Sequence, residues 1–491
     1  MMNKDDNLRN SAGRLTGLLT DRTVSHEVSD DLTLPDHLPE ARRVLSVKGR
    51  ILPPAKYVSR SGVECNGNID YSVLYVGADG GLYSAELSSE YEVTAPLDNG
   101  YEALSDGTAV AVSTVSEGIS ARMSAPRRIN IKNRLRSHIR AYADMSVGEE
   151  SFGGGDIQCL RKDVENATVC ALSSEPIELS CEIGGLSEDT RVISADATVT
   201  VSDLRRSSDC VDASGDVVMK LLVCKENGRA ETLTAKIPFS GTADSGEAMS
   251  DAMCSVYGRV TDINVNVEDG KAVCALSMVL CGMGAVNRQA SYVADVYSTD
   301  RECECLTESY SLPTVRVCGN GNFSQSERIS ASEAGVPEGA WVIDAWGSAS
   351  LDSCEYSGGK YVFSGQSRYS LLCEKDGEYS VCNVELPIKY EIDGAYADSV
   401  SFDALADVIA CRARADGDTL SIDAEIATYT SIFDSSDISV VSETRFGEPF
   451  AERKCRMVVY YPADGEGVWD VAKKYHVPAD SLSEEKNYYL F

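Results

Sequence analysis

The sequence predicts a mainly β chain that consists of three tandem, sandwich-like domains followed by a small strand–helix–helix module. Three observations carry this prediction. Aligned segments recur at a nearly constant spacing, and within each copy apolar and polar residues alternate with the period of a strand. Helical spacing of apolar residues is confined to the end of the chain.

The internal repeat rests on residues that keep one register. Gly67 is followed by Gly215 and Gly365, at intervals of 148 and 150 residues. The same intervals separate the members of three further sets, which are Glu40, Glu188 and Glu338; Val44, Val192 and Val342; and Leu74, Leu222 and Leu372. Four independent positions in one register exclude chance similarity, so the chain contains three copies of one unit.

The repeat suggests the domain boundaries. We expect residues 1–27 to form a leader that is poorly structured or a short helix. The three β repeats are then expected at 28–152, 153–305 and 306–450, and an incomplete C-terminal module at 451–491.

Each repeat is expected to consist of strands joined by tight turns. Ile69, Tyr71 and Val73 alternate with Asp70 and Ser72, which is the pattern of a half-buried strand. Asp-Gly or Asn-Gly turns follow in the three copies, at 77–81, 225–228 and 375–377, and another is expected at 268–270. Because glycine weakens a strand, the repeated glycine predicts a β-bulge or a close approach of two backbones.

Composition limits the class of partner. The 491 residues include 45 Lys and Arg against 77 Asp and Glu, a formal net charge of −32. Such a field repels phosphate backbones and anionic lipid headgroups, so neither nucleic acid nor a membrane surface is an expected partner. With no apolar run long enough for a signal peptide or a membrane span, we expect a cytoplasmic chain without membrane insertion.

The seventeen cysteines are expected to be mostly reduced and buried. Many lie in strand-like segments, among them Cys65, Cys224, Cys274 and Cys373. Cys303 and Cys305 form the only close pair; a metal site is the alternative there, but no second pair or nearby histidine supports it, and core packing is favoured.

The sequence does not indicate an enzyme. None of the four histidines (His26, His37, His138 and His476) lies in a nucleophile motif, and a phosphate-binding loop is absent from the sequence. We therefore expect no catalytic residue, no cofactor and no metal.

The order of motifs in each repeat resembles the SPOCS domain. A Pro-Glu block with a valine four residues later is followed by a glycine-centred strand, an acidic turn with glycine and a further strand, most clearly between Arg191 and Gly241. The SPOCS domain recurs in SipL-type spore coat assembly proteins of clostridia. The resemblance implies a scaffold in which the domain has no catalytic residues.

The C-terminal segment differs in pattern from the repeats. A short strand is expected at 458–460, Val468, Trp469, Ala472 and Tyr475 then fall on one face of a helix, and a second helix is expected from Ala479 onward. The segment from Gly465 to Tyr475 resembles LysM, with Gly467 in place of the usual Ser or Thr helix cap. Only residues 488–491 remain for the closing strand of that fold, which is therefore expected to be missing or reduced.

The resemblance to LysM implies two kinds of partner. LysM modules commonly bind N-acetylglucosamine polymers between two loops, of which only the first is present here. In SipL-like proteins the module is instead implied to bind the ATPase that polymerises as the basement layer of the coat. The candidate binding residues are Asp464, Gly465, Glu466, Gly467, Trp469 and Tyr475. Taken alone, Trp469 and Tyr475 are more simply interpreted as core residues of the module.

One basic segment departs from the acidic background. Arg128, Lys132, Arg134 and Arg136 fall on one face of a predicted strand, whereas Ile129, Ile131 and Leu135 fall on the other. The favoured interpretation is the solvated face of an edge or half-exposed strand. The alternative is a docking stripe for an acidic partner or for a second copy of this chain.

Taken with the resemblance, these features favour a non-enzymatic scaffold of spore envelope assembly, located in the mother cell and at the forespore surface. The alternative is a peptidoglycan- or cortex-binding protein that uses the LysM-like module on glycan, with the β repeats as spacers. A phage-tail or secretion adaptor is a third possibility, which the SPOCS-like triplication disfavours.

Overall fold

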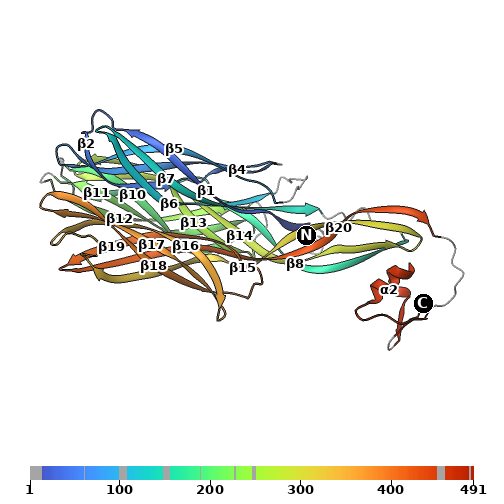
Figure 1. The fold of residues 1–491 in the computed structure, drawn as a ribbon. Helices are drawn as coiled ribbons and strands as arrows, with labels where there is room; N and C mark the ends of the chain where they lie inside the picture. The colour runs from blue at the N-terminus through green and yellow to red at the C-terminus, as the bar shows by residue number, and fades with distance from the viewer. Residues whose placement is uncertain are drawn as a thin grey trace.

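The computed structural model describes residues 14–59, 61–98, 108–146, 155–187, 190–225, 228–245, 250–450, 459–485 and 488–490. Nearly all of them lie in antiparallel strands, and the helical segments are confined to the C-terminal module. The prediction of a mainly β chain is therefore confirmed. The strands run side by side along an elongated body, and the module lies beside one end of it (Figure 1).

The first group of strands forms two sheets. Its members are β1 (Arg14–Thr33), β2 (Ala41–Ile51), β3 (Ala55–Ser59), β4 (Gly62–Gly77), β5 (Leu82–Ala95), β6 (Ala109–Ala125) and β7 (Arg128–Ser146). In one sheet β7 lies between β1 and β6. In the other β4 lies between β2 and β5, and the short β3 replaces β2 beside the first part of β4.

The second and third groups repeat this order. The second comprises β8 (Ile157–Ser173), β9 (Ile177–Gly184), β10 (Arg191–Arg206), β11 (Cys210–Cys224), β12 (Ala230–Asp244), β13 (Met253–Glu268) and β14 (Lys271–Ser298). The third comprises β15 (Arg301–Ser330), β16 (Trp341–Ser357), β17 (Lys360–Lys375), β18 (Glu378–Asp393), β19 (Ser401–Asp416) and β20 (Thr419–Pro449). The strand orders β8-β14-β13 and β10-β11-β12 correspond to β15-β20-β19 and β16-β17-β18, so the three groups share these two three-stranded units, as the repeat predicts. In the second group a single pair between β12 and β8 joins the two units, and β9 adds to β14.

The repeated glycine lies on the central strand of the second sheet in every group. A Cβ on Gly215 would come 1.9 Å from Thr200 O, and a Cβ on Gly365 would come 1.9 Å from Ser350 O. At both places the neighbouring strand shifts register, which is the signature of a β-bulge. At Gly67 the neighbouring strand itself changes from β2 to β3. The predicted bulge is therefore confirmed at Gly215 and Gly365.

Two of the predicted hairpin turns have the expected backbone. Between β17 and β18, Asp376 and Gly377 have φ angles of 52° and 81°. Between β13 and β14, Asp269 and Gly270 have φ angles of 50° and 74°. Positive φ at both central residues is typical of type I′ turns, which match the twist of the flanking strands.

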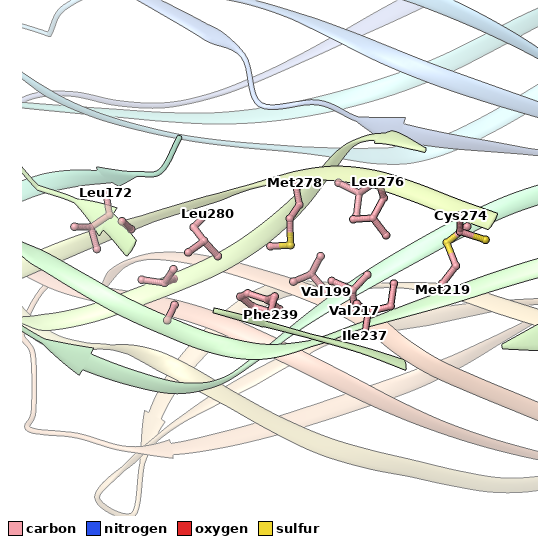
Figure 2. Packing of buried hydrophobic residues seen from close by; sticks show 14 of the residues in the cluster. Leu172, Val199, Val217, Met219, Ile237, Phe239, Cys274, Leu276, Met278 and Leu280 are labelled. Atoms are coloured by element: carbon pink, nitrogen blue, oxygen red, sulfur yellow. The ribbon is translucent and has the colours of Figure 1, made fainter. Parts of the chain in front are cut away.

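The inner faces of the two sheets form the core of each group. Figure 2 shows this packing in the second group, where Val199, Val217 and Ile237 of β10, β11 and β12 face Leu276 and Met278 of β14. Separate clusters of the same kind fill the first and third groups. Each group thus has the two-layer construction expected of a β-sandwich.

The three groups meet around a shared apolar cluster. Residues at equivalent positions of the repeat converge there: Leu74, Leu222 and Leu372, together with Leu45, Ile193 and Ile343. Three side-chain hydrogen bonds link the groups in a ring: Ser84 Oγ to Ile193 O, Thr232 Oγ1 to Ile343 O, and Arg43 Nη2 to Tyr379 O. The first group contacts the second, the second contacts the third, and the third contacts the first. The repeats therefore form a closed, approximately threefold arrangement within one chain.

Two boundary predictions need correction. Residues 14–27 do not form a leader, because they belong to β1, which pairs with β7 along its whole length; residues 1–13 lie outside the described part. Leu15, Thr16, Leu19 and Thr20 are all buried, so this half of the strand lacks the polar alternation that marks a half-buried strand. The boundary at 305/306 falls inside β15, and the one at 152/153 lies outside the described residues.

The described cysteines are all free thiols, and all of them are buried or half-buried. Cys303 and Cys305 pack against the apolar residues Val293, Val296 and Val441, in agreement with the favoured core interpretation. Within the described ranges, no three His, Cys, Asp or Glu side chains are grouped so that they could hold a metal ion. No helix among these residues combines the length and apolarity needed to cross a membrane.

Candidate functional site: the C-terminal module and its contact with the body

In its described residues the C-terminal module contains one α-helix. Its elements are β21 (Val459–Tyr460), α2 (Val468–Tyr475), the 3-10 turn η1 (Ala479–Ser481), β22 (Ser483–Glu485) and β23 (Tyr488–Leu490). The first strand and the helix lie where the sequence predicts them. The expected second helix is only a single 3-10 turn of three residues, because the chain enters β22 at Ser483, directly after Leu482. The reduced closing strand is present as β23, which pairs with both β21 and β22.

The loop from Asp464 to Gly467 is held by Glu466. The carboxylate of Glu466 accepts hydrogen bonds from the Ala463 N–H at 2.9 Å and the Tyr460 hydroxyl at 2.8 Å. These bonds lower the pKa of Glu466 below its usual value. Asp464 is exposed, and Gly465 has a φ of 92°. Glu466 therefore shapes the loop from within the module, and Asp464 is the carboxylate that this loop offers to solvent.

The N-cap residue of the helix makes no side-chain hydrogen bond to the helix backbone. Gly467 is the N-cap, and its N–H donates to Asp470 Oδ2 at 2.9 Å. Asp470 thus satisfies one free backbone donor at the helix start, and its charge suits that end of the helix dipole. Val471 and Ala472 are fully buried and form the apolar side of the helix.

Trp469 points toward the body of the protein. Its indole N–H donates to Asp295 Oδ2 at 2.9 Å, and its ring contacts the Tyr297 ring edge-to-face, with centroids 4.9 Å apart. Lys473, one helical turn further on, donates to both oxygens of Asp295 at 2.6 and 2.7 Å. The interpretation of Trp469 as a residue of the module's own core is therefore wrong. It lies at the contact between α2 and β14.

Further polar contacts extend this interface. The Tyr297 hydroxyl donates to Val477 O at 2.7 Å, and His476 Nδ1 lies 3.2 Å from Ser298 O. Tyr475 packs edge-to-face on Tyr460 within the module. Of the six predicted module residues, Trp469 is placed at the body by a hydrogen bond to Asp295 and a ring contact with Tyr297.

The basic face of β7 is largely neutralised by the chain itself. Lys132 pairs with Glu27 at 3.1 Å, and Arg134 and Arg136 bind the two oxygens of Glu117 at 3.0 and 3.3 Å. Arg136 also contacts Asp352 of the third group at 3.1 Å. Arg128 is exposed at the start of the strand.

The predicted alternation along β7 is confirmed, because Ile129, Ile131 and Leu135 are buried. The strand is the central strand of its sheet, and its outer face is solvated. These internal pairs leave little free positive charge for the proposed docking stripe.

A buried polar junction between the first and third groups was not predicted from the sequence. His138 Nε2 lies 2.6 Å from Asp21 Oδ1, and Nδ1 lies 3.6 Å from Asp403 Oδ1. The fully buried Arg140 approaches Asp21 at 3.3 Å, and Ser113 Oγ donates to Asp403 at 2.9 Å. A cavity of about 400 Å³ lies beside these side chains. Nothing in the local sequence indicates the junction, because its members come from β1, β6, β7 and β19.

Burial and hydrogen bonding act in opposite directions on this junction. Burial alone would lower the pKa of His138, but the hydrogen bonds to Asp21 and Asp403 outweigh it and leave that pKa raised. Burial would likewise raise the pKa of Asp21, but His138 and Arg140 hold it well below its usual range. The hydrogen bonds thus favour the charged forms of His138 and Asp21 over their neutral forms.

Comparison of the chain with models of known protein families, with curated proteins and with solved structures finds no match.

Proposed function

We propose that the chain is a non-enzymatic scaffold of bacterial spore envelope assembly and that its C-terminal module binds a coat morphogenetic protein. The resemblance of the repeats to SPOCS domains, and of the module to LysM, suggests this role. The partner that the resemblance implies is the ATPase of the coat's basement layer.

The observation that carries the proposal is the separation of the molecule into two kinds of unit. The three β groups close on one another through a shared apolar core and form an extended support. The module contributes none of its described residues to the buried clusters of that support and touches it through a few polar and aromatic side chains. A small unit held in this way can engage a partner without disturbing the body.

One feature of the module supports a second function, glycan binding. The exposed carboxylate of Asp464, and Gly465 with its positive φ, lie in the segment that corresponds by resemblance to the loop LysM modules use for N-acetylglucosamine. The second loop of such a groove would have to follow η1, where the described residues Ser483–Glu485 already form the short strand β22. A protein partner is therefore favoured over glycan.

The proposal is tested by capture of the purified basement-layer ATPase on the immobilised full chain. We expect Trp469→Ala to lower the retained ATPase by at least about tenfold, the order expected for loss of one aromatic anchor. Trp341→Ala is the matched control, because Trp341 is 60 % exposed on β16 and far from the module in sequence. Equal capture by both variants, or no capture by the wild type, would reject the proposal.

A further inference from the structure

The contact between α2 and β14 has the construction of a recognition site. Trp469 and Lys473 lie four residues apart, so both project from the same side of the helix. Both donate to the carboxylate of Asp295, which receives three bonds of 2.6 to 2.9 Å from them. A single carboxylate thus occupies a fork made by one indole and one ammonium group.

The strand on the other side is shaped for this contact. The pairing of β14 with β8 shifts register between Val293 and Asp295, so a bulge lies directly before the carboxylate. Bulges change the direction in which a side chain points. Asp295 Oδ1 also accepts from the N–H of Val296 at 2.9 Å, which fixes the carboxylate. Tyr297, two residues on, lies on the same face of the strand and presents its ring to Trp469 and its hydroxyl to Val477.

The recognition face is separate from the core of the module. Val471 and Ala472 are buried within the module, whereas Trp469 and Lys473 are only partly covered. The side chain of Lys473 remains 42 % exposed and that of Asp295 27 % exposed. Such a contact is small, polar and weakened by salt, and it resembles transient interfaces more than obligate ones.

We propose that the face formed by Trp469, Lys473 and His476 recognises an extended strand that carries a carboxylate and, two residues later, an aromatic ring. Asp295 and Tyr297 occupy this face within the same molecule, and a partner protein binds by presenting the same pair and displacing them. The inference deepens the proposed function, because it assigns the chemistry of the partner's segment to the same module.

The first test measures occupancy of the face within one molecule. Lys473 is labelled with an amine-reactive acyl ester in the full chain, and the rate is followed by mass spectrometry. We expect Asp295→Asn to raise the rate at Lys473 by about tenfold, the effect of releasing one charge-assisted pair. Lys474 is the internal control, because it is bonded to Tyr460 and not to Asp295. An unchanged rate at Lys473 would overturn occupancy by Asp295.

The second test measures recognition of the strand. A fluorescent peptide of residues 291–300 is titrated into full-length Asp295→Asn and into the wild type. We expect tighter binding to the variant, because its face is no longer filled from within. The same peptide with asparagine in place of Asp295 is expected to bind neither protein. Equal binding of both peptides would show that the carboxylate is not recognised and would overturn the inference.

The third test separates the inference from the proposed function. The purified ATPase is titrated into the wild type, Asp295→Asn and the control Asp300→Asn, which changes an exposed carboxylate nearby. We expect tighter binding only to Asp295→Asn. Equal binding to all three proteins would place the ATPase on another face and overturn the inference, although the proposed function would stand. If the ATPase binds none of them while the peptide binds, the proposed function fails and recognition of the strand is supported.

Discussion

At the scale of single residues, the junction around His138 shows how burial and charge are balanced. Asp21 and Asp403 both contact the imidazole, and Arg140 adds a second cation beside them. Unpaired charges at such a depth would be costly, so the pairing itself is needed for the first and third groups to meet. No feature of the sequence near His138 reveals this, because the carboxylates are brought in by strands distant along the chain.

The junction makes stability depend on pH in two directions. Folding raises the pKa of His138. The stabilisation that this residue contributes is therefore complete at pH values below its unfolded-state pKa, and it is lost as the pH rises through its folded-state pKa. Folding lowers the pKa of Asp21. The stabilisation that this residue contributes is therefore present at pH values above its unfolded-state pKa, and it is lost as the pH falls toward its folded-state pKa. We expect maximal stability at weakly acidic pH, measured as the urea midpoint between pH 3 and 9.

Replacement of the imidazole should remove the alkaline part of this dependence. We expect His138→Gln to lower the free energy of unfolding by about 1.5–3 kcal/mol at pH 6, the range for hydrogen bonds to charged groups, and by less at pH 9. His37→Gln serves as the control, because His37 is exposed. The same loss at both pH values would contradict the assigned charge on His138.

At the scale of elements, the strands and hairpins were the most predictable features. Asp376-Gly377 and Asp269-Gly270 carry the positive φ angles that their dipeptides indicate. β1 was missed because its first half is buried on both faces and lacks alternation. The second helix of the module was overestimated because pairing of β22 with β23 limits it to one turn. The local sequence pattern therefore predicts strands that have one face in solvent. The strands and helices that it does not predict correctly are those fixed by contacts with distant parts of the chain.

The bulges at the repeated glycine should be intolerant of any side chain. We expect Gly215→Ala and Gly365→Ala each to lower the free energy of unfolding by about 1–3 kcal/mol or more, because the added carbon overlaps a backbone oxygen. Gly319→Ala is the matched control on β15, where a Cβ would meet nothing within 4 Å. The free energies of unfolding of the three variants are measured by chemical denaturation. Loss at Gly319 equal to loss at Gly215 would contradict the close approach.

At the scale of the whole molecule, the closed ring of three groups could not be read from the sequence. The repeat predicts three similar folds, but not that equivalent leucines meet in one cluster. That outcome depends on the pairwise contacts of β5 with β10, β12 with β16 and β18 with β2, which are set by surface shape rather than by local pattern. Trp469 gives the same lesson: its helical position was predicted, but the surface against which it packs was not.

The shared cluster should couple the three groups in unfolding. We expect Leu372→Ala to lower the free energy of unfolding by about 2–5 kcal/mol, the range for a fully buried leucine. The loss should appear in all three groups when hydrogen exchange is followed by peptide. Val267→Ala, at a position 37 % exposed on β13, is the control. Faster exchange confined to the third group would show that the repeats unfold independently.

The most direct test of the scaffold proposal is calorimetric titration of the full chain with two ligands in parallel. One is the purified basement-layer ATPase, and the other is a pentamer of N-acetylglucosamine. We expect saturable binding of the ATPase that is lost in Trp469→Ala, and no measurable heat from the pentamer, because the proposal assigns the module to a protein partner. Saturable binding of the pentamer together with no binding of the ATPase would contradict the account and favour a glycan-binding protein.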